Sequence, residues 1–342
     1  MKIFVDAMGG DNAPESTVKG SLEALRKYPN IEIVLAGIPE KINPYLTDCD
    51  DVKNRITVLD APDVITNHES PVIAVRTKKE SAIVKGMLML RANEVDAFVS
   101  SGSTGAVLAG GIFRLGRVPG VERPCIATML PTASGHVLLC DSGANVDCKA
   151  DWLLQFGIMG DAYMKKVAGI NEPRVGLLNI GAESEKGNAL VKEAYPLIEK
   201  SAPFKFTGNA EGRDVTSGDF DVIIADGFCG NLILKFMEGV AGTLMSMMKK
   251  EMLADTRSKL GALLAKPAFR RLKKSMDYSE VGGAPLLGLS GTVIKAHGSC
   301  NAHAFACAIS QAIKMSEGRV AETIEAELKK ILPQGQAAEK EG

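Results

Sequence analysis

Short apolar runs alternate along the chain with longer segments in which apolar residues recur every third or fourth position. The short runs predict β-strands, and the longer segments predict amphipathic helices. Because a helical pattern follows most of the strand patterns, the sequence predicts an α/β protein whose largely parallel sheet is covered by helices on both faces. The predicted strands are Lys2–Asp6, Ile31–Ala36, Arg55–Leu59, Ala97–Val99, Ile126–Leu130, His136–Cys140, Arg174–Leu178, Phe204–Thr207, Val222–Ala225 and Val293–Ala296.

The helical pattern divides the rest of the chain. A long helical stretch follows Asn231 and runs to about Met276, and we expect a break at Lys266-Pro267 because proline lacks the amide hydrogen that a helix interior uses. The segment Pro131–Gly135 is short enough to predict a hairpin between its two strands. Other helices are predicted from Pro14, near Pro39–Leu46, over Pro71–Arg91, from Thr104, over Asp151–Val167, between Asn188 and Lys200, and from Asn301.

Composition narrows the class of protein. The chain has 342 residues, 46% of them hydrophobic, with a net charge of −1, which predicts a soluble globular protein with a sizeable core. The uncharged run 97–113 is too rich in Gly, Ser and Thr for a membrane span. The N-terminus enters a strand without a signal-peptide core, and the seven cysteines form no C-x-x-C pair. We therefore expect a cytoplasmic, metal-free protein with free thiols.

Five predicted strands end in polar loops that contain glycine or asparagine. Ligands in α/β sheets bind outside the carboxyl ends of the strands, so the five loops are candidates to line one cleft. The alternative for each loop is structural, because Asp and Asn cap helices and Gly ends strands. The loops are Asp6–Asn12, Ser100–Gly105, Asp141–Asn145, Asn179–Asn188 and Asp226–Asn231.

The second of these loops joins a strand to a helix rich in small residues. Its glycines allow close backbone approach, and the hydroxyls of Ser101, Ser103 and Thr104 can donate hydrogen bonds to an anion at the helix N-terminus. It is neither a Walker A loop nor G-x-G-x-x-G. A phosphate or carboxylate cradle and a tight glycine-packed turn are both compatible with this pattern.

The polar inventory favours anion binding over covalent catalysis. Cys229 follows a strand but has no histidine near it in sequence, and no G-x-S-x-G or H-E-x-x-H motif occurs. What remains is Lys186, several asparagines, His297 and hydroxyls. These groups suit the binding and polarisation of an anion.

Six segments together carry a resemblance to a known family: Val5–Pro14, Ser100–Ala106, Asn179–Asn188, Ala225–Asn231, Met276–Ala284 and Val293–Ser299. They resemble the bacterial phosphate acyltransferases called PlsX, and the resemblance covers residues 1 to about 332. It implies a homodimeric three-layer α/β/α fold similar to those of isopropylmalate dehydrogenases and phosphotransacetylases. It also implies that acyl carrier protein (ACP) and inorganic phosphate are the partners, with acyl-ACP and phosphate giving acyl-phosphate and free ACP for phospholipid synthesis.

The resemblance also assigns roles to residues. Lys186 and Asn231 are the expected catalytic pair, Lys186 neutralising phosphate or the oxyanion and Asn231 donating an amide N–H to it. No cofactor and no metal are expected. The residues expected to bind substrate or phosphate are Asp6, Gly9, Gly10, Asp11, Ser101, Ser103, Thr104, Asn145, Asn179, Gly181, Asn188, Asp226 and His297.

A basic amphipathic helical segment, residues 249–275, differs from the rest of the chain. Residues 249–274 hold nine Lys or Arg against Glu251 and Asp255, a net charge of +7. Such a helix suits an anionic membrane or an acidic partner, and the alternative is a solvated helix whose leucines lie in a core or dimer interface. The residues expected to contact membrane or ACP are Leu260, Leu263, Leu264, Lys266, Arg270 and Arg271.

We therefore predict one α/β/α catalytic unit over residues 1–332, compact or divided into two lobes around a cleft, and a disordered tail over 333–342. The resemblance implies a cytoplasmic enzyme at the membrane periphery, near the downstream membrane-bound glycerol-phosphate acyltransferase, and no nucleic-acid partner. A phosphotransacetylase-type enzyme that uses acyl-CoA is the main alternative. A dehydrogenase on the same fold and a non-enzymatic membrane scaffold are further alternatives.

Overall fold

The structure, a computed structural model, describes residues 1–276 and 282–331. The predicted tail 333–342 lies outside these residues, so its disorder stays a prediction. The strands are β1 (Lys2–Asp6), β2 (Glu32–Gly37), β3 (Ile56–Asp60), β4 (Ala97–Ser100), β5 (Cys125–Thr132), β6 (Gly135–Cys140), β7 (Arg174–Asn179), β8 (Lys205–Glu211), β9 (Val222–Ile224), β10 (Ala284–Leu287) and β11 (Thr292–Lys295). The α-helices are α1 (Glu15–Lys27), α2 (Pro39–Ile42), α3 (Pro71–Thr77), α4 (Ala82–Arg91), α5 (Thr104–Gly110), α6 (Ala150–Tyr163), α7 (Ala189–Ser201), α8 (Gly227–Met252), α9 (Thr256–Met276), α10 (Ala302–Glu317) and α11 (Val320–Ile331).

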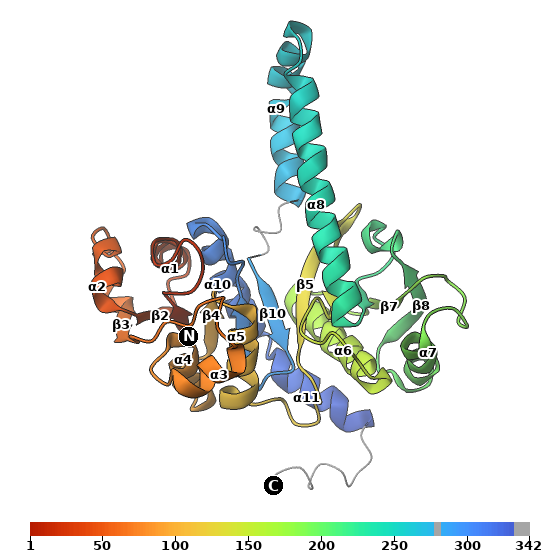
Figure 1. Ribbon diagram of the computed structural model, residues 1–342, viewed down its shortest axis with the longest axis horizontal. Coiled ribbons are helices and arrows are strands. Elements are labelled where there is room, and N and C mark those ends of the chain that lie inside the picture. The colour runs from red at the N-terminus through yellow and green to blue at the C-terminus, as the bar shows by residue number, and fades with distance from the viewer. Residues whose placement is uncertain (277–281, 332–342) are drawn as a thin grey trace.

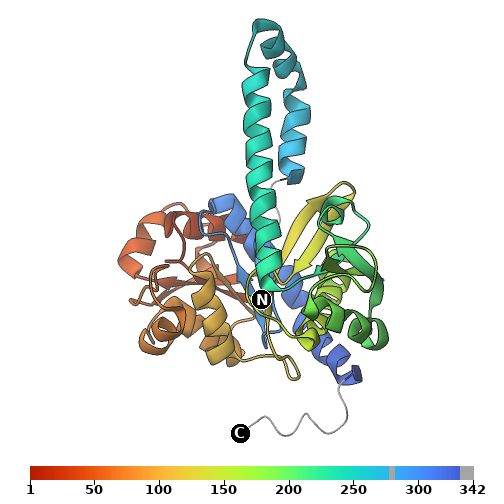
Figure 2. The same ribbon diagram turned by 45° about the vertical axis from the view of Figure 1, so that its right-hand side comes forward.

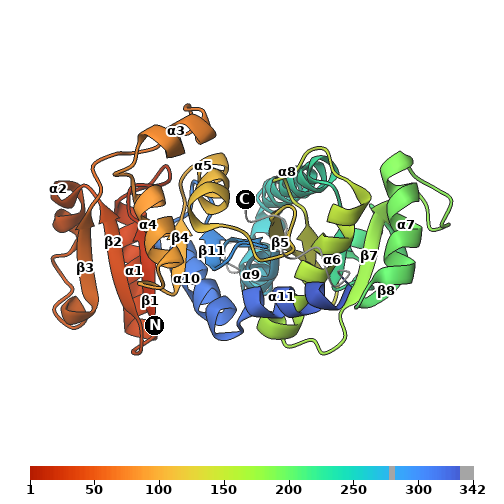
Figure 3. The same cartoon turned by 90° about the horizontal axis from the view of Figure 1, so that it is seen from below.

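All these strands join one sheet in the order β3-β2-β1-β4-β11-β10-β5-β6-β9-β7-β8. Seven of the ten neighbouring pairs are parallel, and the three antiparallel pairs, β11-β10, β10-β5 and β5-β6, lie together in the middle. An odd number of antiparallel steps reverses direction, so the strands from β3 to β11 run opposite to those from β6 to β8. The two parallel halves form two lobes, side by side in Figures 1 and 3. The predicted largely parallel α/β sheet is confirmed.

The N-terminal lobe is packed on both faces of its half of the sheet. On β1, Ile3 and Val5 point into one core and Phe4 points into the other, as the two-residue period of a strand requires. Helices α1 and α10 cover the first face, and α4 covers the second, where Phe4 and Phe98 stack with ring centroids 5.7 Å apart. The close approach of α1 to α10 needs Gly20, because a Cβ there would lie 2.5 Å from the Ala302 carbonyl oxygen.

The C-terminal lobe repeats the three-layer arrangement. Helix α6 covers one face of β6 and β9 with Phe156 and Met159, and α11 packs against α6. The first turns of α8 cover the other face, where Ile233 and Met237 pack against the cluster that contains Ile223. Each lobe therefore has three layers, and one sheet continues from the first lobe into the second.

Beyond this body, α8 and α9 project as an antiparallel helical hairpin (Figures 1 and 2). The predicted break at Lys266-Pro267 is wrong: the turn lies at 253–255, and Pro267 is inside α9. Asp255 makes the turn, since its carboxylate accepts hydrogen bonds from the amides of Arg257 and Ser258. A solvated helix tolerates Pro267 because water can bond to the carbonyl that proline leaves without a donor.

The structure corrects other boundaries. The predicted helix Pro71–Arg91 is two helices, because Ser81 caps a new one through a bond from the Val84 amide to its hydroxyl. The predicted hairpin is confirmed as β5-β6, and β10 and α11 were not predicted. In the described part of the chain, no helix has the length and apolar character needed to cross a membrane.

Candidate functional site

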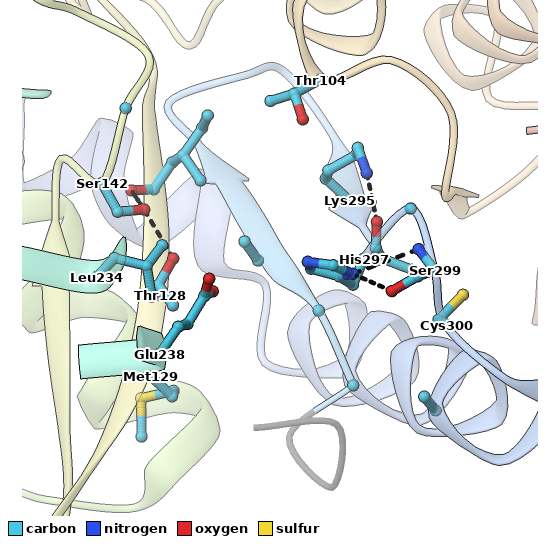
Figure 4. A pocket seen from close by; sticks show the side chains of 18 of the residues that line it. Thr104, Thr128, Met129, Ser142, Leu234, Glu238, Lys295, His297, Ser299 and Cys300 are labelled. Atoms are coloured by element: carbon cyan, nitrogen blue, oxygen red, sulfur yellow. Dashed lines mark hydrogen bonds between the residues drawn. The ribbon is translucent and has the colours of Figure 1, made fainter. Parts of the chain in front are cut away.

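A cavity of about 490 Å³ lies where the two lobes meet. One wall is the end of β11, with Lys295, and the loop that follows it, with His297 and Ser299 (Figure 4). The facing wall combines β5, the loop after β6 and the first turns of α8, with Thr128, Ser142 and Glu238 among its side chains. Three residues predicted from the sequence line it, namely Thr104, Asn231 and His297.

The loop after β1 interlocks with the loop after β4 behind this cavity. The buried Asp6 carboxylate accepts a 2.7 Å bond from the Ser100 hydroxyl, and burial raises the pKa of Asp6. Ser101 donates a 2.7 Å bond to the Gly9 carbonyl, and a Cβ on Gly9 would lie 2.6 Å from the Gly102 nitrogen. Asp6, Gly9 and Ser101 do not line the cavity. They hold together the two loops that lie behind its wall.

Two further members of the same loop tie it to the loop after β11. The Asp11 amide donates a 2.8 Å bond to the Gly298 carbonyl, and Gly10 has a φ of +97°, a conformation that favours glycine. Ser103 sits at the N-cap of α5 without a side-chain capping bond. The first two predicted loops therefore meet the His297–Ser299 turn at the carboxyl ends of β1, β4 and β11.

A second cavity, of about 840 Å³, lies against the opposite face of the first turns of α8, at the ends of β7 and β9. Apolar side chains such as Leu153 and Val191 contribute much of its lining. The predicted residues Asn179, Asn188 and Asp226 also line it. Asn188 caps α7 and Asp226 caps α8, through bonds of 3.0 Å and 2.8 Å to main-chain amides, so each has a structural task.

Four of the five predicted loops line one or both of the two cavities: Thr104, Ser142, Gly143 and Asn231 line the first, and Asn179, Asn188, Asp226 and Cys229 line the second, whereas no residue of Asp6–Asn12 lines either. The loop after β6 and the first turns of α8 reach the first cavity despite the reversal of strand direction, and the two cavities lie against opposite faces of those turns of α8. Asn231 lines the first cavity, whereas Lys186 is exposed on the loop beside the second and lines neither. Gly181 lies under Lys186, and the Asn145 side chain bonds to Pro124 and Asp141 instead of lining either cavity.

Lys295 is a cavity residue that the sequence reasoning did not single out for a role. Its side chain is 8% exposed, and burial lowers the pKa of Lys295 to about 8. The ammonium bonds to two main-chain carbonyls, those of Ser101 at 3.4 Å and of Ala296. A signal was present in the sequence, because Lys295 directly follows the apolar run Val293-Ile294 of a predicted strand, although lysine is mostly an exposed residue type.

The thiols at these cavities are not activated. Burial raises the pKa of Cys229, beside the second cavity, to about 11, and it also raises the pKa of Cys300, which lines the first. Both are protonated near neutral pH, so neither is a ready nucleophile.

The fold places the chain among the α/β proteins that include phosphotransacetylases. It aligns with a phosphotransacetylase from Streptococcus pyogenes at a TM-score of 0.61 and 14% identity, covering 92% of this chain and 94% of that one. EutD phosphotransacetylase from Staphylococcus aureus gives a TM-score of 0.57 at 16% identity, with 94% of each chain covered. At these identities the likeness shows the fold alone.

The chain belongs to the family described as "Fatty acid synthesis protein", whose model matches residues 1–323. It is 46% identical to a phosphate acyltransferase from Clostridium acetobutylicum, over 97% of this chain and 100% of that protein. It is 49% identical to a phosphate acyltransferase from Alkaliphilus oremlandii, over 95% of this chain and 96% of that one. The family expected from the six sequence segments is thereby confirmed.

Proposed function

We propose that this chain is a phosphate acyltransferase that transfers an acyl group from acyl-ACP to inorganic phosphate in phospholipid synthesis. The observation that carries the proposal is identity of 46–49% to phosphate acyltransferases over nearly the whole of both chains. The cavity between the lobes supports it, because an amide, hydroxyls and a buried cation in its lining suit a phosphate and a polarised carbonyl.

The reaction needs little acid–base help from the protein. A phosphate oxygen attacks the thioester carbonyl, the tetrahedral intermediate collapses, and the C–S bond breaks to leave acyl-phosphate and the ACP thiolate, which then takes a proton from solvent. Phosphate dianion is already a nucleophile, and a thiolate is a good leaving group. The protein supplies proximity and stabilises the oxyanion, where one well-placed donor contributes about 3 kcal/mol.

Asn231 and Lys186 are the proposed catalytic residues. The place of Asn231 in the first cavity supports its role, since its amide can donate to an anion there. The proposed role of Lys186 rests on the family resemblance alone, because its side chain is exposed and lines neither cavity. A second subunit or a shift of the 180–188 loop is needed to bring Lys186 to the first cavity.

The thioester can be tested directly. Purified protein is given inorganic phosphate with acyl-ACP or acyl-CoA, and acyl-phosphate is trapped as the hydroxamate while free thiol is measured. Phosphate-dependent product from acyl-ACP supports the proposal, and product from acyl-CoA alone favours the phosphotransacetylase-type alternative. No product from either thioester contradicts both.

The helical hairpin supports two proposals about assembly. Exposed apolar residues follow one stripe of α8 at spacings of three and four, which suits burial against a second subunit: Phe228, Leu232, Phe236, Val240, Leu244 and Met247. On α9, the exposed Leu260, Leu263 and Leu264 lie near basic residues, which suits an anionic membrane surface. We propose a cytoplasmic homodimer at the membrane periphery, close to the membrane-bound glycerol-phosphate acyltransferase that would use its product.

A further inference from the structure

Lys295 is a buried cation without an acidic partner at contact distance. Its side chain is more than nine-tenths buried, and no carboxylate lies within ion-pair distance of Nζ in residues 1–276 and 282–331. An ammonium has three donors, and two of them bond to the carbonyls of Ser101 and Ala296. Buried charges in proteins are normally paired or bind a ligand, so a bound anion would stabilise the charged form of Lys295.

The surroundings of Lys295 in the cavity are those of an anion site. The N-terminus of α10, a helix of 16 residues, lies at the same wall, with Asn301 and Ala304 among the lining residues. The hydroxyls of Thr104 and Ser299 are further donors there. Glu238 is the acidic residue of the lining, and it is paired with Lys235 at 2.8 Å. A negative charge is therefore favoured at the Lys295 wall.

We propose that Lys295 is the residue that binds the phosphate co-substrate, holding it between the N-terminus of α10 and the Asn231 side chain. The inference rests on the proposed function and adds to it the place of the phosphate and the cation that holds it. Asn231 lines the same cavity from α8, so a thioester carbonyl between the two would meet phosphate on one side and an amide donor on the other.

A purely structural Lys295 is the competing explanation. In that case its bonds to Ser101 and Ala296 would serve to join the ends of β4 and β11. The main chain already does this, because β4 and β11 pair in parallel over four residues and the Ala296 amide donates to the Ser100 carbonyl at 2.9 Å. An apolar residue of similar length would then fill the space at less desolvation cost.

The first experiment measures phosphate binding without catalysis. The thermal unfolding midpoint of the full chain is followed against inorganic phosphate, with chloride at equal ionic strength as the reference. Wild type should be stabilised progressively, because a ligand that binds only the folded state raises the midpoint. Lys295→Met should lose this response while its midpoint in chloride stays equal or rises. Lys85→Met is the matched control, because Lys85 also bonds to a main-chain carbonyl, that of Asp60, but lies outside the cavity.

The second experiment separates binding from positioning. With the thioester that wild type accepts, Lys295→Met should raise the KM for phosphate by about tenfold or more and change the KM for the thioester by less than about twofold. Lys295→Gln is the second variant. Its amide can still donate a hydrogen bond to a carbonyl, so this variant can be tested if Lys295→Met does not fold.

The outcomes are distinct. A phosphate response of wild-type size in either folded variant overturns the inference, as does a wild-type midpoint that phosphate does not move. Loss of the response in both variants but not in Lys85→Met supports it. If wild type binds phosphate through Lys295 but makes no acyl-phosphate from any thioester, the proposed function fails and the phosphate site stands.

Discussion

At the scale of single residues, burial and charge decide which side chains act at the cavity. The sequence identified Asn231, Thr104 and His297, and the structure places all three in its lining. It did not identify Lys295, because a local pattern cannot show that a charge at a strand end is buried against a loop far away in sequence, here at Ser101. Lys186 illustrates the reverse case, since a conspicuous loop lysine proved exposed and outside both cavities.

Asn231 offers the clearest catalytic test. Asn231→Ala should lower kcat by about 10²-fold, because it removes one donor from a preorganised site. The free energy of unfolding should change little, since the side chain is exposed to the cavity. Steady-state rates and chemical denaturation measure the two effects. A folded variant with near wild-type turnover would remove Asn231 from the mechanism.

Lys295 leads to the prediction that stability and phosphate affinity change in opposite directions with pH. Its pKa is lowered from an ordinary 10.5 to about 8, so the folded protein loses this proton at lower pH than the unfolded chain. Between those values the unfolded chain binds more protons, and the free energy of unfolding in chloride should rise with pH. Phosphate affinity should fall over the same range, because the cation that binds phosphate is neutralised.

The groups around Lys295 are Asp6 and Asp11 behind it, Cys300 and His297 beside it, and Glu238 with Lys235 on the facing helix. Lys295→Met provides the comparison, since both trends attributed to Lys295 should be absent from it. Phosphate-dependent midpoints from pH 7 to 10, a range set by that pKa, measure them. Identical pH profiles for wild type and variant would show that another group controls phosphate binding.

At the scale of elements, the apolar pattern predicted most strands to within about two residues but misplaced helix ends. Strand β1 was predicted with its exact bounds, because a buried parallel strand is a continuous apolar run. The turn between α8 and α9 was missed because Pro267 is a stronger local signal than the Asp255 cap, although the cap determines where the helix begins. Short β10 escaped notice because it contains Pro285 and has only four residues.

The exposed leucines of α9 lead to a test of membrane binding. Each leucine that enters the bilayer contributes about 1.5–3 kcal/mol, and each nearby Lys or Arg adds about 1 kcal/mol on anionic lipid. Replacement of Leu260, Leu263 and Leu264 by Glu should abolish sedimentation with anionic vesicles and leave turnover of soluble acyl-ACP intact. For wild type, binding should weaken as salt is raised.

Two results would count against the membrane surface. Undiminished vesicle binding by a folded triple variant would exclude these leucines from the contact. Loss of folding or of the oligomer would instead assign them a structural role within the hairpin or between subunits.

At the scale of the whole molecule, the predicted loops are divided between two cavities because these lie against opposite faces of the first turns of α8. The hairpin β5-β6 was predicted, but its consequence for the sheet depends on β10, which adds two more antiparallel pairs. Only the complete strand order shows that the strands from β3 to β11 run opposite to those from β6 to β8. Loop chemistry was readable from the sequence, whereas the grouping of the loops depended on contacts between residues more than 100 positions apart.

The exposed stripe of α8 leads to a prediction about assembly. Phe236 and Leu244 are 70% and 50% exposed in the single chain, at positions where six apolar side chains share one face of the helix. If a second copy covers this stripe, Phe236→Glu with Leu244→Glu should convert the dimer to a monomer, because each charge would be buried without a partner. Light scattering after size exclusion measures the mass.

A control pair on α9, Lys259→Glu with Lys266→Glu, changes charge without changing the apolar stripe and should remain dimeric. A doubly substituted α8 variant that stays dimeric would place the subunit interface elsewhere. If the monomer also loses turnover while it still binds phosphate, the second subunit supplies part of the catalytic site, and Lys186 is the first candidate for that contribution.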